Sequence, residues 1–436
     1  MNNNIQIIKK WKCDNQIFNF VHRIKHFKQF FDSRLYNNLI LIIKQIIATR
    51  NSRQADIWLS NGLTLRKVQY FFWGSKWYYD KLNNLRLLLL RKVQCYKDTE
   101  KDILIFDWSV FNKNKNSSFR GLADFFYSNT LKKATNWFYL MWASIINEKG
   151  LKYILDFKFY YKRMWNKMKC WKKFFINMIK KTKAKLVILD REFSKDDFCT
   201  YLYKKAKKDF LVRFSDKRAI WVPWKFLAKK KSRRKHMLNH LRYNIWEVMK
   251  DFTYFQVKTT HMSGKLWILT DVLVNSWKKH WHMPVTLIIF QADRQNTPLV
   301  LVTSKKINNT TDLQEYLYEA IKMVFFYYKR WSIEDLFKET KFRFNIDKFK
   351  VLSETSIYKY MHIILFAYTI VQIFIEFIPY RLKISIMDFL YKTRNIKKDW
   401  LSVIRVKLFF ESVNRLFYLS VRDIYCLLKE QKWLTA

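Results

Sequence analysis

Residues 327–341 read Tyr-Tyr-Lys-Arg-Trp-Ser-Ile-Glu-Asp-Leu-Phe-Lys-Glu-Thr-Lys, and this stretch decides how the chain is interpreted. Four polar residues stand in it at fixed spacings: Tyr327, Arg330, Glu334 and Lys341. On a helical wheel measured from Glu334, the other three fall at about +20°, −40° and −20°. The spacing therefore predicts one helix that carries all four side chains on a narrow face.

Apolar residues flank this polar row and would let the helix dock on a core while the row faces a cleft. They are Phe326, Ile333, Leu336 and Phe337. A carboxylate beside two cations and a phenol suits a phosphodiester substrate. The alternative is an ordinary amphipathic helix, in which Arg330 and Glu334 form an i,i+4 ion pair.

Two upstream segments supply further carboxylates. Residues 103–106, Ile-Leu-Ile-Phe, and residues 186–189, Leu-Val-Ile-Leu, have the composition of short buried strands, and they end in Asp107 and Asp190. Carboxylates at the ends of neighbouring strands meet at one edge of a sheet. Mg²⁺ prefers such oxygen ligands. The alternative is that both aspartates only end strands or cap helices.

These motifs together resemble the DDE transposases of bacterial insertion sequences, in the branch with a Tyr-Arg-Glu-Lys signature. Asp107, in Phe-Asp-Trp-Ser, and Asp190, in Leu-Asp-Arg-Glu, match the two catalytic aspartates. Glu334, in Tyr-Tyr-Lys-Arg-Trp-Ser-Ile-Glu, matches the catalytic glutamate. Val302-Thr303-Ser304 resembles the family's strand before the glutamate helix, and the resemblance covers about residues 50–380.

The resemblance implies an α/β fold: an RNase H-like core with a β-rich insertion between the second aspartate and the glutamate, flanked by helical N- and C-terminal regions. The expected division is a helical DNA-binding domain at 1–100, the first part of the core at 101–215, the insertion at 216–305, the second part of the core with the catalytic helix at 306–380, and a helical C-terminal region at 381–436.

Finer patterns predict individual elements. Strands are expected at residues 138–145, 210–214, 252–259, 266–273, 285–290 and 299–303, and a long Lys/Trp-rich helix at about 158–181. In the N-terminal region Asn61-Gly62 and Gly74-Ser75 are the clearest breaks between helical runs. Arg66, Lys67, Lys76 and Lys81 are candidates there for phosphate contacts.

The resemblance implies a cut-and-paste transposase that binds the terminal inverted repeats of its element, nicks DNA by metal-assisted hydrolysis and joins the freed 3′-hydroxyls to target DNA. Asp107, Asp190 and Glu334 would hold two Mg²⁺ ions, for which Mn²⁺ is expected to substitute. Tyr327, Arg330 and Lys341 would contact DNA phosphates. A homodimer would assemble on the DNA.

Two positions depart from the family pattern. Arg191-Glu192-Phe193 lacks the glycine that often follows the second aspartate, and Leu299 is the other departure. Members that excise through a DNA hairpin carry a tryptophan on the strand before the Thr, where this chain has Leu299; Trp277 and Trp281 lie upstream. Two other functions stay open. One is a domesticated relative that binds DNA without cutting it, and the other is an RNase H-fold nuclease without strand transfer.

Composition sets the outer bounds. The chain has 436 residues, half of them apolar, and a formal net charge of +48, which favours nucleic acid as the partner. The five cysteines show no Cys-x-x-Cys pair, so neither zinc nor disulfides are expected.

The N-terminus has no signal-peptide pattern, and the apolar stretch at 361–379 holds His362, Gln372 and Glu376, which favours a buried helix over a membrane span. A bacterial cytoplasmic location beside the nucleoid is expected.

Overall fold

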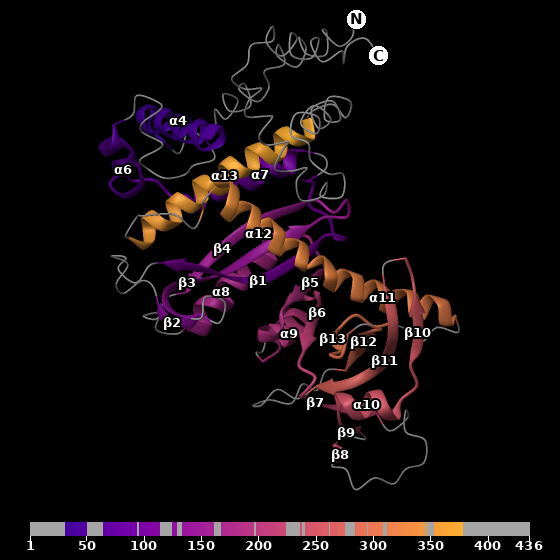
Figure 1. Cartoon of the computed structure of the whole chain (residues 1–436). Helices are drawn as coiled ribbons and strands as arrows, with labels where there is room; N and C mark the ends of the chain where they lie inside the picture. Colours follow the sequence, from indigo (N-terminus) through magenta and orange to yellow (C-terminus); the bar gives the residue numbers. More distant parts are fainter. Residues whose placement is uncertain are drawn as a thin grey trace, which may run out of the picture. The chain divides into compact units, whose positions relative to one another are not determined.

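The structure is a computed structural model that describes most, but not all, of the chain (Figure 1). The described residues are 31–49, 64–93, 96–113, 124–128, 133–160, 167–195, 198–223, 236–237, 240–260, 262–274, 284–293, 295–307, 312–344, 346 and 353–377. Two compact units divide the chain: Gln94–Phe337 is one, and Met1–Val93 together with Lys338–Ala436 is the other.

The unit Gln94–Phe337 is built on a large sheet. Its strands are β1 (Ile103–Lys113), β2 (Asp124–Ser128), β3 (Lys133–Ile146), β4 (Lys152–Tyr160), β5 (Leu186–Leu189), β6 (Asp209–Phe214), β7 (Ala219–Pro223), β8 (His236–Met237), β9 (His240–Asn244), β10 (Phe255–Lys258), β11 (Ser263–Val274), β12 (Val285–Ala292) and β13 (Leu299–Thr303). Its helices are α8 (Lys167–Lys180), the 3₁₀ helix η2 (Arg191–Lys195), α9 (Phe198–Tyr201), the π-helix η3 (Leu202–Ala206), α10 (Ile245–Asp251), α11 (Leu313–Lys329) and the first half of α12 (Trp331–Phe344).

The strand order runs β2-β3-β1-β5-β6-β13-β12-β11-β7-β9-β8, with β4 paired to β3 and β10 paired to β11. Strands β1, β3 and β4 pair antiparallel, whereas β1, β5 and β6 run parallel. An antiparallel meander followed by two parallel strands is consistent with the expected RNase H-like core. The fold is therefore mixed α/β, as predicted.

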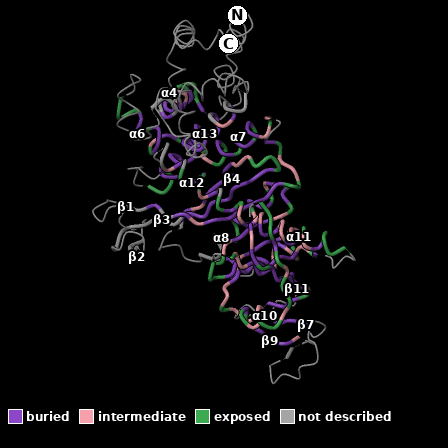
Figure 2. Tube along the Cα trace, turned by 45° about the vertical axis from the view of Figure 1, so that its right-hand side comes forward, coloured by how far each residue is buried: buried purple, intermediate pink, exposed green. Residues whose placement is uncertain are grey.

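Aromatic packing fixes the centre of this sheet. Phe106 in β1 is fully buried, and its ring centroid lies 4.4 Å from that of Phe175 in α8 and 6.5 Å from that of Phe193 in η2. Burying one such side chain stabilises the fold by about 2–3 kcal/mol. Figure 2 shows the burial of each described residue along the trace, and residues 103–107 of β1 are all buried. The core thus holds the backbone directly before Asp107 in place.

Strands β7 to β13 fill the stretch in which a β-rich insertion is expected. Strands β11 and β12 form an antiparallel pair with an irregularity between Leu269 and Val272, where Asp271 has a positive φ of 57°. Strand β13 pairs antiparallel with β6 and so joins this part to the parallel strands. The predicted strands at 285–290 and 299–303 lie within β12 and β13, whereas the one at 252–259 is shorter, because β10 covers only Phe255–Lys258.

Two predicted elements are wrong in their bounds. Residues 158–160 of the helix expected at about 158–181 belong instead to β4, and the described helix α8 covers Lys167–Lys180. Residues 157–160 read Phe-Lys-Phe-Tyr, a run rich in aromatic side chains that pairs with β3, which favours a strand. The strand expected to end at Asp107 continues to Lys113, because β3 pairs with it along its whole length.

The second unit is helical in its described part. It contains α4 (Ser33–Thr49), α6 (Leu65–Trp73), α7 (Tyr79–Lys92), the end of α12 and α13 (Glu354–Phe377). Gly74 ends α6, which confirms that predicted break; Asn61-Gly62 lies outside the described residues. Residues 356–370 of α13 are all buried, His362 among them, so the predicted buried helix is confirmed. Among the described residues, no helix has the length and apolar character needed to cross a membrane.

Candidate active site

The pairing of β1 with β5 brings the two predicted aspartates to the same level of the sheet. The last parallel pair is Phe106 with Leu189. Asp107 and Asp190 are the next residues along the two neighbouring strand paths, so they lie at the same level. Asp107 remains in β1 opposite Trp142 of β3, whereas the chain turns at Asp190 into η2, with Phe193 N donating to Asp190 O at 3.1 Å. The predicted convergence of the two carboxylates rests on this register.

Asp107 is buried, and both of its carboxylate oxygens accept hydrogen bonds. Its Oδ1 accepts a hydrogen bond from the backbone N of Trp108 at 2.8 Å, and its Oδ2 accepts one from Arg330 Nη1 at 2.8 Å. The side chains of both Asp107 and Arg330 are 7% exposed, so this is a buried ion pair. Water screens such a pair far less than a surface pair.

Arg330 stands at a break between two helices. Helix α11 ends at Lys329, Arg330 keeps helical angles (φ −55°, ψ −42°), and α12 begins at Trp331. The hydrogen bonds here are of the tighter i→i+3 type: Arg330 N donates to Tyr327 O at 3.0 Å, and Ile333 N donates to Arg330 O at 2.9 Å. The single helix predicted across residues 327–341 is therefore wrong, although the turn stays close to helical.

Glu334 in the first turn of α12 shares the same guanidinium. Arg330 Nη2 lies 3.4 Å from Glu334 Oε1, and the Glu334 side chain is 43% exposed. The i,i+4 ion pair expected of an ordinary amphipathic helix is thus present. The same guanidinium, however, also binds Asp107, so Arg330 bridges a strand carboxylate and a helix carboxylate.

Burial and neighbouring charges set the protonation of this cluster. Burial raises the pKa of Asp107 to about 6, although Arg330 and the Trp108 N–H act in the opposite direction. The charges of Asp190 and Glu334 raise it further. Burial alone would lower the pKa of Arg330, but Asp107, Tyr327, Asp190 and Glu334 together raise it. The three predicted carboxylates therefore belong to one electrostatic cluster around Arg330.

Tyr327, in the last turn of α11, lies next to Arg330. It is fully buried, and burial raises its pKa to about 12. The Arg330 guanidinium carbon lies 5.5 Å from the centroid of the Tyr327 ring. Within the described part of the chain, the Tyr327 hydroxyl and Arg330 Nε have no hydrogen-bond partner. Two buried donors without partners at a charged site are suited to a ligand with acceptor oxygens.

Arg213 is a basic residue of this site that the sequence patterns did not single out. The last parallel pair of β5 with β6 is Leu189 with Val212, so Arg213 follows at the level of Asp190. Its charge acts on Tyr327 and lowers the pKa of that phenol, against the larger effect of burial. The only signal in the sequence was an arginine within the apolar strand predicted at residues 210–214, which is too common to be specific.

Lys341, the last member of the predicted row, is partly exposed in α12, seven residues after Glu334. It belongs to the other compact unit, and its place beside the carboxylates stays a prediction. Ile333, Leu336 and Phe337 are buried as expected, and Phe337 stacks on Trp142 of β3 with ring centroids 4.9 Å apart. The apolar face of α12 therefore docks on the sheet.

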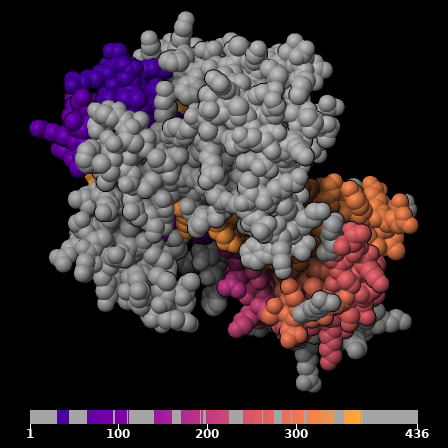
Figure 3. Space-filling model, turned by 45° about the horizontal axis from the view of Figure 1, so that its top comes forward, coloured from indigo at the N-terminus to yellow at the C-terminus, as the bar shows by residue number. Residues whose placement is uncertain are grey.

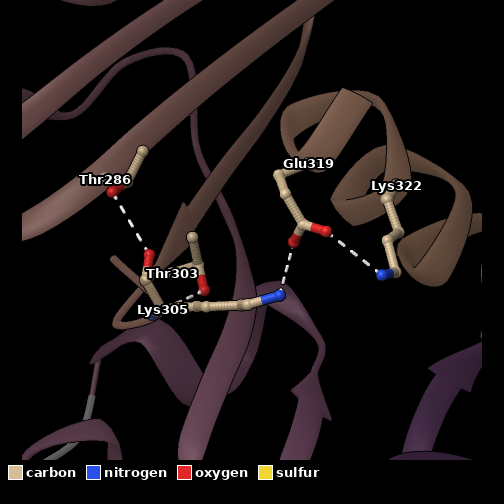
Figure 4. A network of polar contacts seen from close by, with 5 residues as sticks. All are labelled: Thr286, Thr303, Lys305, Glu319 and Lys322. Atoms are coloured by element: carbon tan, nitrogen blue, oxygen red, sulfur yellow. Dashed lines mark hydrogen bonds and ion pairs between the residues drawn. The ribbon is translucent and has the colours of Figure 1, made fainter. Parts of the chain in front are cut away.

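A polar network ties α11 to the end of β13 (Figure 4). Lys305 Nζ lies 2.5 Å from Glu319 Oε2, and Lys322 Nζ lies 3.1 Å from Glu319 Oε1. Lys305 N donates to Thr303 Oγ1 at 3.1 Å, and Thr286 Oγ1 donates to Lys305 O at 3.3 Å. This network anchors the helix that leads into Arg330.

The three carboxylates are chemically suited to bind a divalent metal ion. Carboxylate oxygens are the ligands that Mg²⁺ prefers, and Asp107, Asp190 and Glu334 supply them within one cluster. Among the described residues, however, no group of three His, Cys, Asp or Glu side chains is placed to hold a metal ion. Arg330 supplies the positive charge instead, bound to Asp107 and Glu334. The carboxylate donors are therefore of the type that binds Mg²⁺, and in this structure the carboxylate side chains are arranged around the Arg330 guanidinium.

Comparison with known families agrees with this geometry. A family model described as a transposase DDE domain matches residues 98–370, which is more than half of the chain. The chain belongs to the DDE transposase family. Members of this family generally use divalent metal ions, and the family implies DNA binding. No curated protein matches the chain in a sequence comparison.

Proposed function

We propose that the chain is a cut-and-paste DNA transposase whose catalytic residues are Asp107, Asp190 and Glu334. The observation that carries this proposal is the placement of Asp107 level with Asp190, together with the bridge from Asp107 through Arg330 to Glu334. The cluster joins a residue of β1, the residue that follows β5 and a residue of α12, which are far apart in the sequence.

The three carboxylates would hold two Mg²⁺ ions. When bound, such ions activate the attacking oxygen and stabilise the leaving oxygen of a phosphodiester. The resemblance to the family implies the order of events: water nicks an element end, and the freed 3′-hydroxyl then attacks target DNA. The protein forms no covalent bond in this scheme.

Tyr327, Arg330 and Lys341 would bind phosphates beside the scissile bond. Arg330 offers a planar fork of donors, of which Nε has no partner in the described part of the chain, and Tyr327 offers a buried hydroxyl. Transfer of the Arg330 donors from Asp107 to a DNA phosphate would release a carboxylate oxygen. Arg213, beside Asp190, would add a further positive charge.

The remaining parts of the chain would serve the same reaction. The N-terminal helical region would bind the terminal repeats, residues 216–305 would form the β-rich insertion, and two copies would assemble on DNA near the bacterial nucleoid. Leu299, buried at the start of β13, stands where hairpin-forming members carry a tryptophan; Trp277 and Trp281 lie outside the described residues.

The test is incubation of purified protein with a labelled duplex that carries its own flanking DNA, a target plasmid and Mg²⁺. Nicks at one position, together with joined products in the plasmid, support a transposase. Nicks without joined products would point to an RNase H-fold nuclease. DNA binding without nicks, across several salt and metal conditions, would point to a domesticated binder. Chelation of the metal with EDTA should abolish both products.

A further inference from the structure

Two aromatic side chains within the motifs of the candidate site have no part in the proposed reaction. Trp108 directly follows Asp107 in Phe-Asp-Trp-Ser, and Phe193 lies three residues after Asp190 in Leu-Asp-Arg-Glu-Phe. Their rings stack on each other, with centroids 5.6 Å apart and planes inclined by 13°. The stack therefore connects the segment after the first aspartate to the segment after the second.

The stack lies on the face of the sheet opposite to the Asp107 side chain. Side chains two residues apart in a strand share one face, whereas the residue between them faces the other way. Phe106 and Trp108 both pack on α8, where their ring centroids lie 4.4 Å from Phe175 and 4.3 Å from Trp171. Helix α8 therefore covers this face, and Asp107 faces away from it.

Phe193 is fixed in place by contacts of its own. It is 2% exposed, and its ring meets that of Phe198 in α9 edge-on, with centroids 5.6 Å apart and planes inclined by 73°. Arg218 Nη1 donates to the carbonyl of Ser194, the next residue in η2, at 2.8 Å. The short helix η2 is thus held from two sides, and the Phe193 ring gives Trp108 a fixed surface to pack against.

Trp108 also contacts the Asp107 carboxylate directly. Trp108 N donates to Asp107 Oδ1 at 2.8 Å, so a displaced Trp108 would displace a hydrogen-bond donor of that carboxylate. The charge of Asp190 raises the pKa of Asp107, which indicates that the two carboxylates repel each other. Like charges keep a fixed separation only when the surrounding structure supports them. A stack behind the two aspartates supplies such support.

We propose that Trp108 and Phe193, named here the Trp108–Phe193 stack, are positioning residues that set the separation of Asp107 and Asp190. The inference rests on the proposed function, in which these two carboxylates bind metal together. Loss of a residue that orients metal ligands commonly weakens metal binding or activity by about 10- to 100-fold. The alternative is a stack that only stabilises the fold, and its removal would then lower the melting temperature without changing metal binding.

The experiment titrates the full chain, free of DNA, with Mn²⁺ and measures the unbound ion by electron paramagnetic resonance. Trp108→Ala and Phe193→Leu should each weaken Mn²⁺ binding by about tenfold or more. Trp108→Phe keeps a ring for the stack and should bind Mn²⁺ nearly as wild type does. The double variant Trp108→Ala with Phe193→Leu should lose no more affinity than the weaker of the two single variants, because both substitutions remove the same contact.

Trp267→Ala is the matched control, because it removes a tryptophan from another ring pair of the same unit. Trp267 in β11 is 3% exposed, and its ring centroid lies 5.4 Å from that of Tyr254. Strands β6, β13 and β12 separate β11 from β5 in the sheet. In the space-filling view the rose-coloured segments that include β10 and β11 reach the surface (Figure 3). This variant should have a lower melting temperature and the Mn²⁺ affinity of wild type.

Wild-type Mn²⁺ affinity in both Trp108→Ala and Phe193→Leu would overturn the inference. An equal loss of affinity in Trp267→Ala would also overturn it, because the loss would then reflect destabilisation alone. The Mn²⁺ concentration for half-maximal nicking should rise about tenfold in Trp108→Ala, in agreement with the binding measurement. Failure of the proposed function would show differently, as wild-type protein that binds Mn²⁺ and duplex DNA without nicking, and the Mn²⁺ affinities would still decide the positioning role.

Discussion

Arg330 and Asp107 form a buried ion pair, with Arg330 Nη1 2.8 Å from Asp107 Oδ2, although 223 residues separate them. The same guanidinium reaches Glu334, so the pair couples the strand that carries the first aspartate to the helix that carries the glutamate. Desolvation of two charges opposes such a pair, and the loss of either partner leaves the other buried and uncompensated.

Arg330→Ala should therefore lower the free energy of unfolding by about 3 kcal/mol at pH 7, because Asp107 would lose its counter-charge. Chemical denaturation measures this value. Lys329→Ala, at the exposed neighbouring position, is the control and should cost under about 1 kcal/mol. Equal values for the two variants would argue that the ion pair is not held in solution.

Asp107 should give stability a definite dependence on pH. Its pKa is about 6 in the folded protein and about 3.9 in an unfolded chain, so the folded state binds the proton more tightly. The contribution to the free energy of unfolding is then fully present below about pH 4 and is lost as pH rises to about 6, by about 3 kcal/mol.

The comparison of wild type with Asp107→Asn isolates this contribution in metal-free protein. Denaturation at several values between pH 4 and 7 should show that wild type loses stability relative to the variant as pH rises. Asp335→Asn, at an exposed site in α12, serves as the control, and its free energy of unfolding should change with pH as that of wild type does. A stability difference between wild type and Asp107→Asn that stays constant with pH would contradict the assigned pKa.

Gly264→Ala should destabilise the unit Gln94–Phe337 without changing a residue of the candidate site. A Cβ atom at Gly264 in β11 would stand 2.2 Å from the Gln291 carbonyl oxygen and 2.8 Å from Ala292 Cα, both in the backbone of β12. Backbone atoms of a paired strand cannot move aside as a side chain can, so a cost of about 1–3 kcal/mol is expected. A melting temperature equal to that of wild type would show that the strands are further apart than described.

Arg213→Gln should weaken DNA binding through the loss of one phosphate contact. The substitution keeps a polar side chain that can donate a hydrogen bond while removing its charge from the level of Asp190. The salt slope of duplex binding should fall by about one. A slope identical to that of wild type would limit Arg213 to a local electrostatic effect on Tyr327.

The sequence predicted that Asp107 and Asp190 follow short buried strands, and the structure places these strands side by side in parallel, with the two aspartates at the same level. The sequence also predicted the apolar face of α12, and Ile333 and Leu336 on that face are buried. Both patterns are local and follow the period of their elements. The family match over residues 98–370 agrees with what these patterns predicted.

The break at Arg330 and the extent of β1 could not be predicted in this way. A helical wheel assumes one continuous helix, whereas Arg330 binds a carboxylate 223 residues away and sits in a turn of i→i+3 hydrogen bonds. Likewise β1 runs past Asp107 because β3 pairs with it as far as Lys113. Both features depend on contacts that are distant in sequence. Arg213 was missed for the same reason, since its neighbours come from the register of β5 and β6.

The measurement that tests the central claim most directly follows nicking and binding of the same labelled duplex in parallel, with Mg²⁺, for wild type, Asp107→Asn, Asp190→Asn and Glu334→Gln. Asp335→Asn, one residue after Glu334 and exposed, is the matched control. We expect all three carboxylate variants to lose nicking while they keep binding, and Asp335→Asn to nick like wild type. Retained nicking in any of the three would remove that residue from the catalytic set and contradict the proposed site.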